Sequence, residues 1–190
     1  MNQPQRIALY GGTFDPFHQG HLFLIQQAIA QAKLDAVIVL PCQISPHKKM
    51  GSPTHFHHRS AMAKIACAGL AKISIDDYES TQAPPSYSWK TVEHFRATLP
   101  HAQLFWILGF DQWQALPQWA NPDFLAKNLT FLVFAREKSP SPRAGWRMQE
   151  LRGTHPASAT AIRLPDSPHY LSAHWLHPEV RKYIAEHHLY

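Results

Sequence analysis

Short apolar runs alternate with longer stretches of mixed polarity along most of the chain. The short runs are rich in β-branched and aromatic residues, and they predict strands at residues 7–10, 36–41, 72–76, 104–109 and 129–135. The mixed stretches between them predict helices at residues 21–33, 58–70, 89–99 and 122–127. Alternating helices and apolar strands are typical of a parallel sheet covered by helices on both faces. The pattern therefore predicts an α/β fold, a doubly wound parallel sheet of five or six strands, in a single domain over residues 1–190.

The last part of the chain follows this pattern less closely. Residues 137–157 are rich in proline, glycine, serine and arginine, and no clear strand precedes Ser158, so we expect a loop-rich segment there. Residues 158–190 are expected to be helical in part. Apolar residues recur at helical spacing after Pro178, which itself suits the first turn of a helix, and they predict a terminal amphipathic helix at residues 178–189.

The composition is that of a folded domain. Of the 190 residues, 45% are hydrophobic and only 16% are charged, which supplies a sizeable core and argues against disorder. The formal net charge of +5 fits an anionic ligand without identifying it, and no run of like charges resembles a nucleic-acid-binding tail. Cys42 and Cys67 are not closely paired, and no segment reads as a signal peptide or a membrane span. We expect a cytoplasmic protein that binds neither membrane nor nucleic acid, and nothing in the sequence indicates a homo-oligomer.

The most informative segment is GGTFDPFHQGH at residues 11–21, which follows the first predicted strand and leads into the first predicted helix. The first N–H groups of a helix have no helical partners and carry partial positive charge, so a strand–loop–helix junction of this kind suits phosphate binding. Gly11 and Gly12 let the backbone pass close to a ligand, and Gly20 lets the helix start approach a triphosphate.

His18 and His21 lie three residues apart across the junction between the loop and the helix. At that spacing both imidazoles can reach one point above the helix start and donate hydrogen bonds to phosphate oxygens, either as neutral rings or as cations. Such donors stabilise the negative charge that builds up as a phosphoryl bond breaks. A chance pair on the surface or a metal pair would have the same spacing. The position of the pair inside the glycine-bearing loop favours the phosphate role.

The whole GGTFDPFHQGH segment resembles the signature of the nicotinate-nucleotide adenylyltransferases, which belong to the HxGH nucleotidyltransferases. The related phosphopantetheine adenylyltransferases usually carry threonine at the position of His18. The resemblance implies a Rossmann-like sheet with ligands at the carboxyl ends of its strands, in agreement with the alternation described above. It also implies that the loop binds ATP through Gly11, Gly12, Thr13, Phe14, His18, Gly20 and His21.

Further segments match the same family on the side of the acceptor nucleotide. His47 and Lys48 follow the second predicted strand, where the family holds phosphate, although a solvated basic loop would look the same. Tyr87 and Ser88 lie in a PSYS segment that resembles the family's PSYT, and Ser88 is also a good N-cap for the next predicted helix. Trp119 matches the aromatic residue that stacks on the pyridine ring. The implied acceptor-binding residues are Asp15, His47, Lys48, Tyr87, Ser88, Trp119 and Arg136.

Matches on the ATP side occur at two later points in the chain. Gly109 and Asp111 follow the fourth predicted strand as in the family's G-x-D, whose carboxylate hydrogen-bonds a ribose hydroxyl. Ser158, Thr160 and Arg163 match the family's S-S/A-T-x-I-R, which offers hydroxyls and a guanidinium to the ATP phosphates. The residues implied to supply charge stabilisation during catalysis are His18, His21, Lys48 and Arg163.

The resemblance implies an enzyme of NAD biosynthesis that joins AMP from ATP to nicotinate mononucleotide, giving deamido-NAD and pyrophosphate. The attacking phosphate is already anionic, so positioning and charge stabilisation suffice without a covalent intermediate. Mg²⁺ is expected to arrive with ATP, held by phosphates and water, and no metal site of the protein itself is predicted. The tight spacing of His55, His57 and His58 suits a tetrahedral metal site poorly unless other segments supply ligands, so a solvated helix start is the favoured interpretation.

Three alternatives stay open at this point. A sister transferase could use the same loop with nicotinamide mononucleotide or phosphopantetheine as the acceptor. A non-catalytic nucleotide-binding protein could share the fold, although the presence of His18, His21 and Arg163 argues against it. A nucleic-acid-binding module is suggested only by the net charge.

Overall fold

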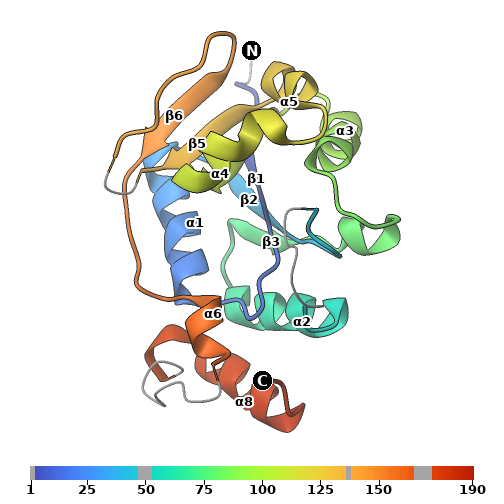
Figure 1. Ribbon diagram of the computed structural model, residues 1–190, viewed down its shortest axis with the longest axis vertical. Helices are drawn as coiled ribbons and strands as arrows, with labels where there is room; N and C mark the ends of the chain where they lie inside the picture. The colour runs from blue at the N-terminus through green and yellow to red at the C-terminus, as the bar shows by residue number, and fades with distance from the viewer. Residues whose placement is uncertain (1–2, 47–52, 136–137, 165–172) are drawn as a thin grey trace.

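A six-stranded sheet forms the centre of the computed structural model, which describes residues 3–46, 53–135, 138–164 and 173–190. All neighbouring strands are parallel, in the order β3-β2-β1-β4-β5-β6. This arrangement confirms the predicted doubly wound α/β fold (Figure 1). The strands are β1 (Arg6–Gly12), β2 (Ala36–Pro41), β3 (Ile73–Ile75), β4 (Gln103–Gly109), β5 (Thr130–Phe134) and β6 (Arg147–Leu151).

Helices connect the strands and cover the sheet on both faces. The α-helices are α1 (Gln19–Gln31), α2 (Phe56–Cys67), α3 (Ser88–Thr98), α4 (Phe110–Ala115), α5 (Pro122–Asn128), α6 (Ala159–Ile162) and α8 (Pro178–Glu186). Two short 3₁₀ turns, η1 (Tyr78–Thr81) and η2 (Leu116–Gln118), complete the connections. Helix α8 lies where the sequence predicts a terminal helix, and it packs on α2 (Figure 1).

The alternation of side chains along β1 builds a core on each face of the sheet. Ala8 and Tyr10 belong to the buried cluster that the sheet forms with α1, α2 and α8. Ile7 and Leu9 belong to a second cluster, formed with α3, α4 and α5. Because side chains of a strand point alternately to opposite faces, a strand buried on both faces must be apolar throughout. This explains why the central strands β1 and β4 are the clearest strands in the sequence.

The strand order places a crevice at the carboxyl ends of β1 and β4. These two strands are neighbours, with Ile7 beside Leu104. The helix that follows β1 covers one face of the sheet, whereas the helix that follows β4 covers the other. Connections that leave neighbouring strands in opposite directions open a crevice between them, and doubly wound folds bind ligands there.

One expectation about the fold is wrong. The sequence predicts a surface loop through residues 137–157, but Arg147–Leu151 form the strand β6, which pairs with β5 at the edge of the sheet. Only Leu151 is buried in this strand, and the other positions carry mainly polar side chains. An edge strand needs no continuous apolar run, so the pattern that reveals β1 and β4 is absent here.

Within the described ranges, no helix combines the length and the apolar character needed to cross a membrane.

Candidate active site

The loop between β1 and α1 lies at the carboxyl end of β1, where the crevice opens. Phe14 in this loop is buried, has a left-handed backbone with φ of 50°, and meets the His21 ring edge-on with 5.0 Å between ring centroids. A Cβ on Gly12 would stand 2.8 Å from the Phe14 ring, so this packing requires glycine at that position. Phe14 thus supports His21 from within the loop itself.

His18 and His21 face each other across the start of α1. Their rings are stacked, with centroids 3.6 Å apart and planes 17° from parallel. Nδ1 of His18 accepts the backbone N–H of His21 at 3.4 Å, and Nδ1 of His21 accepts the backbone N–H of His18 at 3.2 Å. Because both Nδ1 atoms accept a hydrogen bond, a neutral ring at either position carries its proton on Nε2. The helix start therefore offers two Nε2–H donors side by side.

Burial sets the protonation state of His18. Its side chain is only 7% exposed, and burial, assisted by the nearby His155, lowers its pKa from 6.5 to about 4. His18 is therefore a neutral donor at neutral pH in the free protein, so the cationic form considered from the sequence does not apply to it. Gly20 keeps room for this ring, since a Cβ there would lie 3.0 Å from two atoms of the His18 imidazole.

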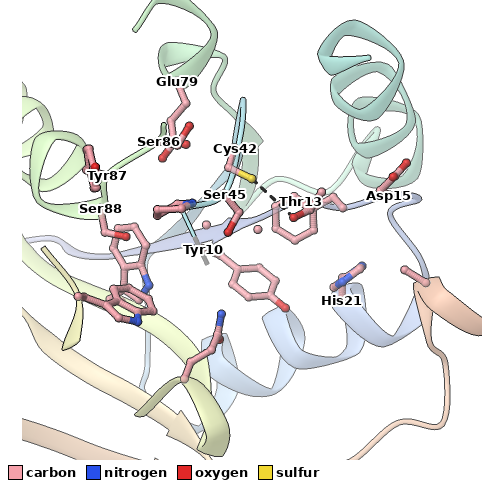
Figure 2. Close-up of a pocket in the computed structure, with 18 of the residues that line it drawn as sticks. Tyr10, Thr13, Asp15, His21, Cys42, Ser45, Glu79, Ser86, Tyr87 and Ser88 are labelled. Atoms are coloured by element: carbon pink, nitrogen blue, oxygen red, sulfur yellow. Dashed lines mark hydrogen bonds between the residues drawn. The ribbon is translucent and has the colours of Figure 1, made fainter. Parts of the chain in front are cut away.

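Two cavities meet at His21. The smaller one has a volume of about 330 Å³, and Figure 2 shows Tyr10, His21 and Tyr87 among the side chains around it. The larger one has a volume of about 1040 Å³ and includes the ends of β4 and β5. The residues that line both cavities are Tyr10, His21, Gln112, Ala159 and Thr160.

The cavities bring together most of the residues singled out from the sequence. Those that line the smaller cavity alone are Gly11, Gly12, Thr13, Phe14, Asp15, Tyr87, Ser88, Trp119 and Arg163. Those that line the larger cavity alone are His18, Gly20, Gly109, Asp111 and Ser158. The expected acceptor residues in the described ranges share the smaller cavity with Gly11, Gly12, Thr13, Phe14 and Arg163, which the family resemblance assigns to ATP, whereas the ribose-binding candidate Asp111 lies in the larger cavity. His47, Lys48 and Arg136 lie outside the described residues.

Known proteins are similar to this chain in sequence and in fold. The family model described as Cytidylyltransferase-like matches residues 9–164. The nicotinate-nucleotide adenylyltransferase of Bacillus subtilis is 32% identical over 190 residues, covering 98% of each chain. A probable nicotinate-nucleotide adenylyltransferase of Albidiferax ferrireducens is 37% identical over 199 residues, again covering 98% of each chain. The chain belongs to the nicotinate-nucleotide adenylyltransferase family.

The fold is also similar to that of a solved structure, which is named as an adenylyltransferase of nicotinic acid mononucleotide. A Plasmodium falciparum nicotinic acid mononucleotide adenylyltransferase, complexed with NaAD, superimposes with a TM-score of 0.81 at 19% identity. The superposition covers 97% of each chain, so the two proteins share the fold.

The segment that resembles the family's S-A-T-x-I-R borders both cavities, since Ala159 and Thr160 line each of them. Ser158 caps α6, as its Oγ accepts the backbone N–H of Ala161 at 3.4 Å. Arg163 follows this short helix, and its Nη1 donates to the backbone carbonyl of Asp15. This contact ties the segment after β6 to the loop after β1, and it brings the Arg163 guanidinium to the smaller cavity.

Two neighbouring tryptophans have different roles in this nicotinate-nucleotide adenylyltransferase family member. Trp113 is 1% exposed in the core, where its Nε1 donates to the carbonyl of Ser141 at 3.0 Å. Trp119 lies in the wall of the smaller cavity with Tyr87 and Ser88. The alternative of Ser88 as an N-cap is wrong, because α3 begins at Ser88 itself and its N-cap residue is Tyr87.

Arg59, for which the sequence indicates no role, connects three segments around the site by hydrogen bonds. Arg59 is 1% exposed, and its guanidinium donates to three backbone carbonyls from separate segments. The acceptors are Thr13 at 2.7 Å, Gln43 at 3.1 Å and Thr54 at 2.7 Å. Arg59 therefore joins the loop after β1, the loop after β2 and the residues just before α2, although it lines neither cavity itself.

Glu79 is a second residue that the sequence did not reveal. It lines the smaller cavity, is only 4% exposed, and accepts the Thr91 hydroxyl on Oε1 at 2.9 Å. Its Oε2 is buried without a hydrogen-bond partner among the described residues. Burial raises the pKa of this carboxyl above its ordinary value. A buried acidic group thus borders the cavity that holds the expected acceptor residues.

The histidine cluster at the start of α2 offers no metal site. In the part of the chain that the structure describes, no group of three or more His, Cys, Asp or Glu is placed to hold a metal ion. His55 and His57 are exposed, with their Nδ1 atoms 2.7 Å apart. His58 is turned toward α8, where its Nδ1 lies 2.9 Å from the Tyr183 hydroxyl. The cluster is therefore solvated in part and otherwise forms the contact between α2 and α8.

Proposed function

We propose that this protein transfers AMP from ATP to nicotinate mononucleotide, producing deamido-NAD and pyrophosphate. The observation that carries the proposal is the meeting of two cavities at His21. ATP is assigned to the larger cavity, which contains His18 and Asp111, and the acceptor to the smaller one. Relatives named as nicotinate-nucleotide adenylyltransferases over nearly the whole chain support the same reaction.

In this reaction the phosphate of the acceptor attacks the α-phosphorus of ATP while the bond to pyrophosphate breaks. Negative charge on the phosphate oxygens is then met by the Nε2–H donors of His18 and His21 and by the guanidinium of Arg163. The donors are already in position before the substrates bind, because each imidazole is fixed by a backbone N–H. Lys48, outside the described residues, is proposed as a further cation on the strength of the sequence alone.

Mg²⁺ enters as part of the ATP substrate in this proposal. The described residues provide no three-ligand group for it, and Mg²⁺ commonly keeps water and substrate phosphates as its ligands. Its contribution would be to neutralise phosphate charge as pyrophosphate leaves. We further propose that the protein acts in the cytoplasm, without a nucleic-acid partner.

A pyrophosphate-release assay with ATP and three separate acceptors tests the function. The acceptors are nicotinate mononucleotide, nicotinamide mononucleotide and phosphopantetheine, and the product is identified by its mass. We expect kcat/KM to be at least about tenfold higher with nicotinate mononucleotide, which corresponds to about 1.4 kcal/mol of selective recognition. Preference for either other acceptor would reassign the smaller cavity, and ATP binding without turnover would make the protein a non-catalytic nucleotide binder.

A further inference from the structure

The carboxylate of Asp15 is held by residues that are distant in the sequence. Asp15 is 7% exposed. Its Oδ1 accepts the hydroxyl of Tyr190 at 2.5 Å, and its Oδ2 accepts the backbone N–H of Thr54 at 3.2 Å. The backbone carbonyl of Asp15 accepts a hydrogen bond from Arg163. Hydrogen bonds to an ionised carboxylate are short and strong, so the contact with Tyr190 is the principal side-chain restraint on Asp15.

The end of α8 is shaped so that it brings Tyr190 to this position. His188 has a left-handed backbone with φ of 49°, and its N–H donates to the carbonyl of Ala185 at 3.3 Å. The N–H of Leu189 donates to the carbonyl of Ile184 at 3.0 Å. These two bonds form a Schellman motif, which ends a helix and turns the chain back. Leu189 then packs on the core, so the hydroxyl of Tyr190 is directed onto the loop after β1.

Arg163 is anchored on the same residue. Its guanidinium donates to the backbone carbonyl of Asp15, and its positive charge acts on the Tyr190 phenol. If the phenol were removed, Oδ1 of the buried Asp15 carboxylate would lose its donor, and the residue that carries the Arg163 acceptor would lose a restraint. Arg163 would then be less firmly fixed at the smaller cavity, which it lines together with Asp15.

We propose that Tyr190 is a positioning residue, whose hydroxyl satisfies Asp15 and so keeps Arg163 directed toward the substrate phosphates. This inference rests on the proposed adenylyl transfer. Tyr190 itself touches neither cavity, since it is not among the residues that line them, so it acts through Asp15 and Arg163. Burial and the bond to Asp15 both raise the pKa of Tyr190, which keeps the phenol protonated as a donor at neutral pH.

The test compares Tyr190→Phe, which removes only the hydroxyl, with the matched variant Tyr183→Phe on the same chain segment. The Tyr183 hydroxyl contacts His58 between α2 and α8, away from both cavities. We expect Tyr190→Phe to lower kcat/KM about tenfold, the usual effect of losing one charge-assisted hydrogen bond. Tyr183→Phe is expected to change it less than about twofold, even though it loosens the same helix. Equal losses in both variants would show that Tyr190 only anchors α8, and would overturn the proposal.

A double-mutant cycle with Asp15→Ala, which removes the acceptor of the Tyr190 hydroxyl, separates positioning from a general loss of stability. The two residues act through one hydrogen bond, so Tyr190→Phe should cause little further loss in the Asp15→Ala background. Additive losses would contradict the proposal. Independently of turnover, hydrogen exchange of residues 13–18 should be faster in Tyr190→Phe than in Tyr183→Phe. Unchanged exchange would overturn the positioning role, whereas absence of product from the unsubstituted protein would refute only the proposed reaction.

Discussion

The imidazoles of His18 and His21 hold each other in place, because each ring accepts the backbone N–H of the other residue while the two rings stack at 3.6 Å. The arrangement fixes the direction of both Nε2–H groups without any contact from a substrate. A site that stabilises developing charge is most effective when its donors need no rearrangement at the moment of reaction. The reciprocal bonds supply that preorganisation from within the first turn of α1.

Replacing His21 by alanine tests its place at the junction of the two cavities. The variant loses a donor to the transferring phosphate, and we expect turnover to fall by about 10²-fold or more. Steady-state kinetics with ATP and nicotinate mononucleotide measure the loss, and circular dichroism checks that the fold is kept. His101→Ala, at an exposed histidine outside both cavities, is the matched control and should be fully active. Near-normal turnover of His21→Ala would remove His21 from the mechanism.

The lowered pKa of His18 predicts a loss of stability in mild acid. Between pH 6.5 and about 4 the unfolded chain binds a proton at this residue and the folded protein does not, so unfolding becomes easier as the pH falls. The free energy of unfolding should drop by about 2 kcal/mol between about pH 7.5 and about pH 5 from this residue alone. Urea titrations of the protein and of His18→Asn at both pH values measure the difference. If the two proteins lose stability equally, His18 is not buried as a neutral ring.

Arg59 predicts a large effect on stability from a residue outside both cavities. Arg59→Met leaves three partly buried backbone carbonyls without their donor, and a group left unpaired away from water costs about 1–3 kcal/mol. We expect a loss of about 3 kcal/mol or more in the free energy of unfolding, measured by urea denaturation. Arg59→Lys retains the charge but cannot reach all three acceptors. Its free energy of unfolding should therefore lie between those of the unsubstituted protein and Arg59→Met. Arg96→Met, which removes a single bond to the carbonyl of Ala102, is the matched control and should cost far less.

The two neighbouring tryptophans predict opposite outcomes for the same substitution. Trp113→Ala creates a core cavity and should lower the free energy of unfolding by about 3–5 kcal/mol. Trp119→Ala, at a half-buried residue that packs on the edge of the same core, should cost less stability than Trp113→Ala and raise KM for the acceptor about tenfold, since an aromatic wall of the smaller cavity is lost. Thermal unfolding measures the loss of stability in each variant, and steady-state kinetics measure KM for the acceptor. An unaltered KM in Trp119→Ala would exclude this residue from acceptor binding.

The sequence predicts the central part of the fold well, because β1 and β4 are buried on both faces over Ile7–Tyr10 and Leu104–Leu108, where the side chains are aliphatic or aromatic. The same reasoning fails at β6, where an edge position leaves Arg147–Leu151 largely polar. The loop after β1 also stands out in the sequence, because the residues that indicate phosphate binding are contiguous at positions 11–21, between a strand and a helix.

The residues that support the site cannot be recognised from the sequence in this way. Arg59 bonds to backbone carbonyls, which every residue possesses, so no sequence pattern marks its partners. Tyr190 reaches Asp15 only because the chain turns back after α8, and that geometry depends on tertiary packing. The sequence thus indicates which groups line the cavities more readily than which groups hold them in place.

The bond between Asp15 and Tyr190 joins positions 175 residues apart. The loop after β1 therefore gains this restraint only when the segment that follows α8 has docked on it. Contacts that span such a length tend to form late in folding, because closing a long loop is entropically unfavourable. We therefore expect the loop that carries Asp15 to reach its final rigidity among the last steps of folding, after α8 has packed on α2.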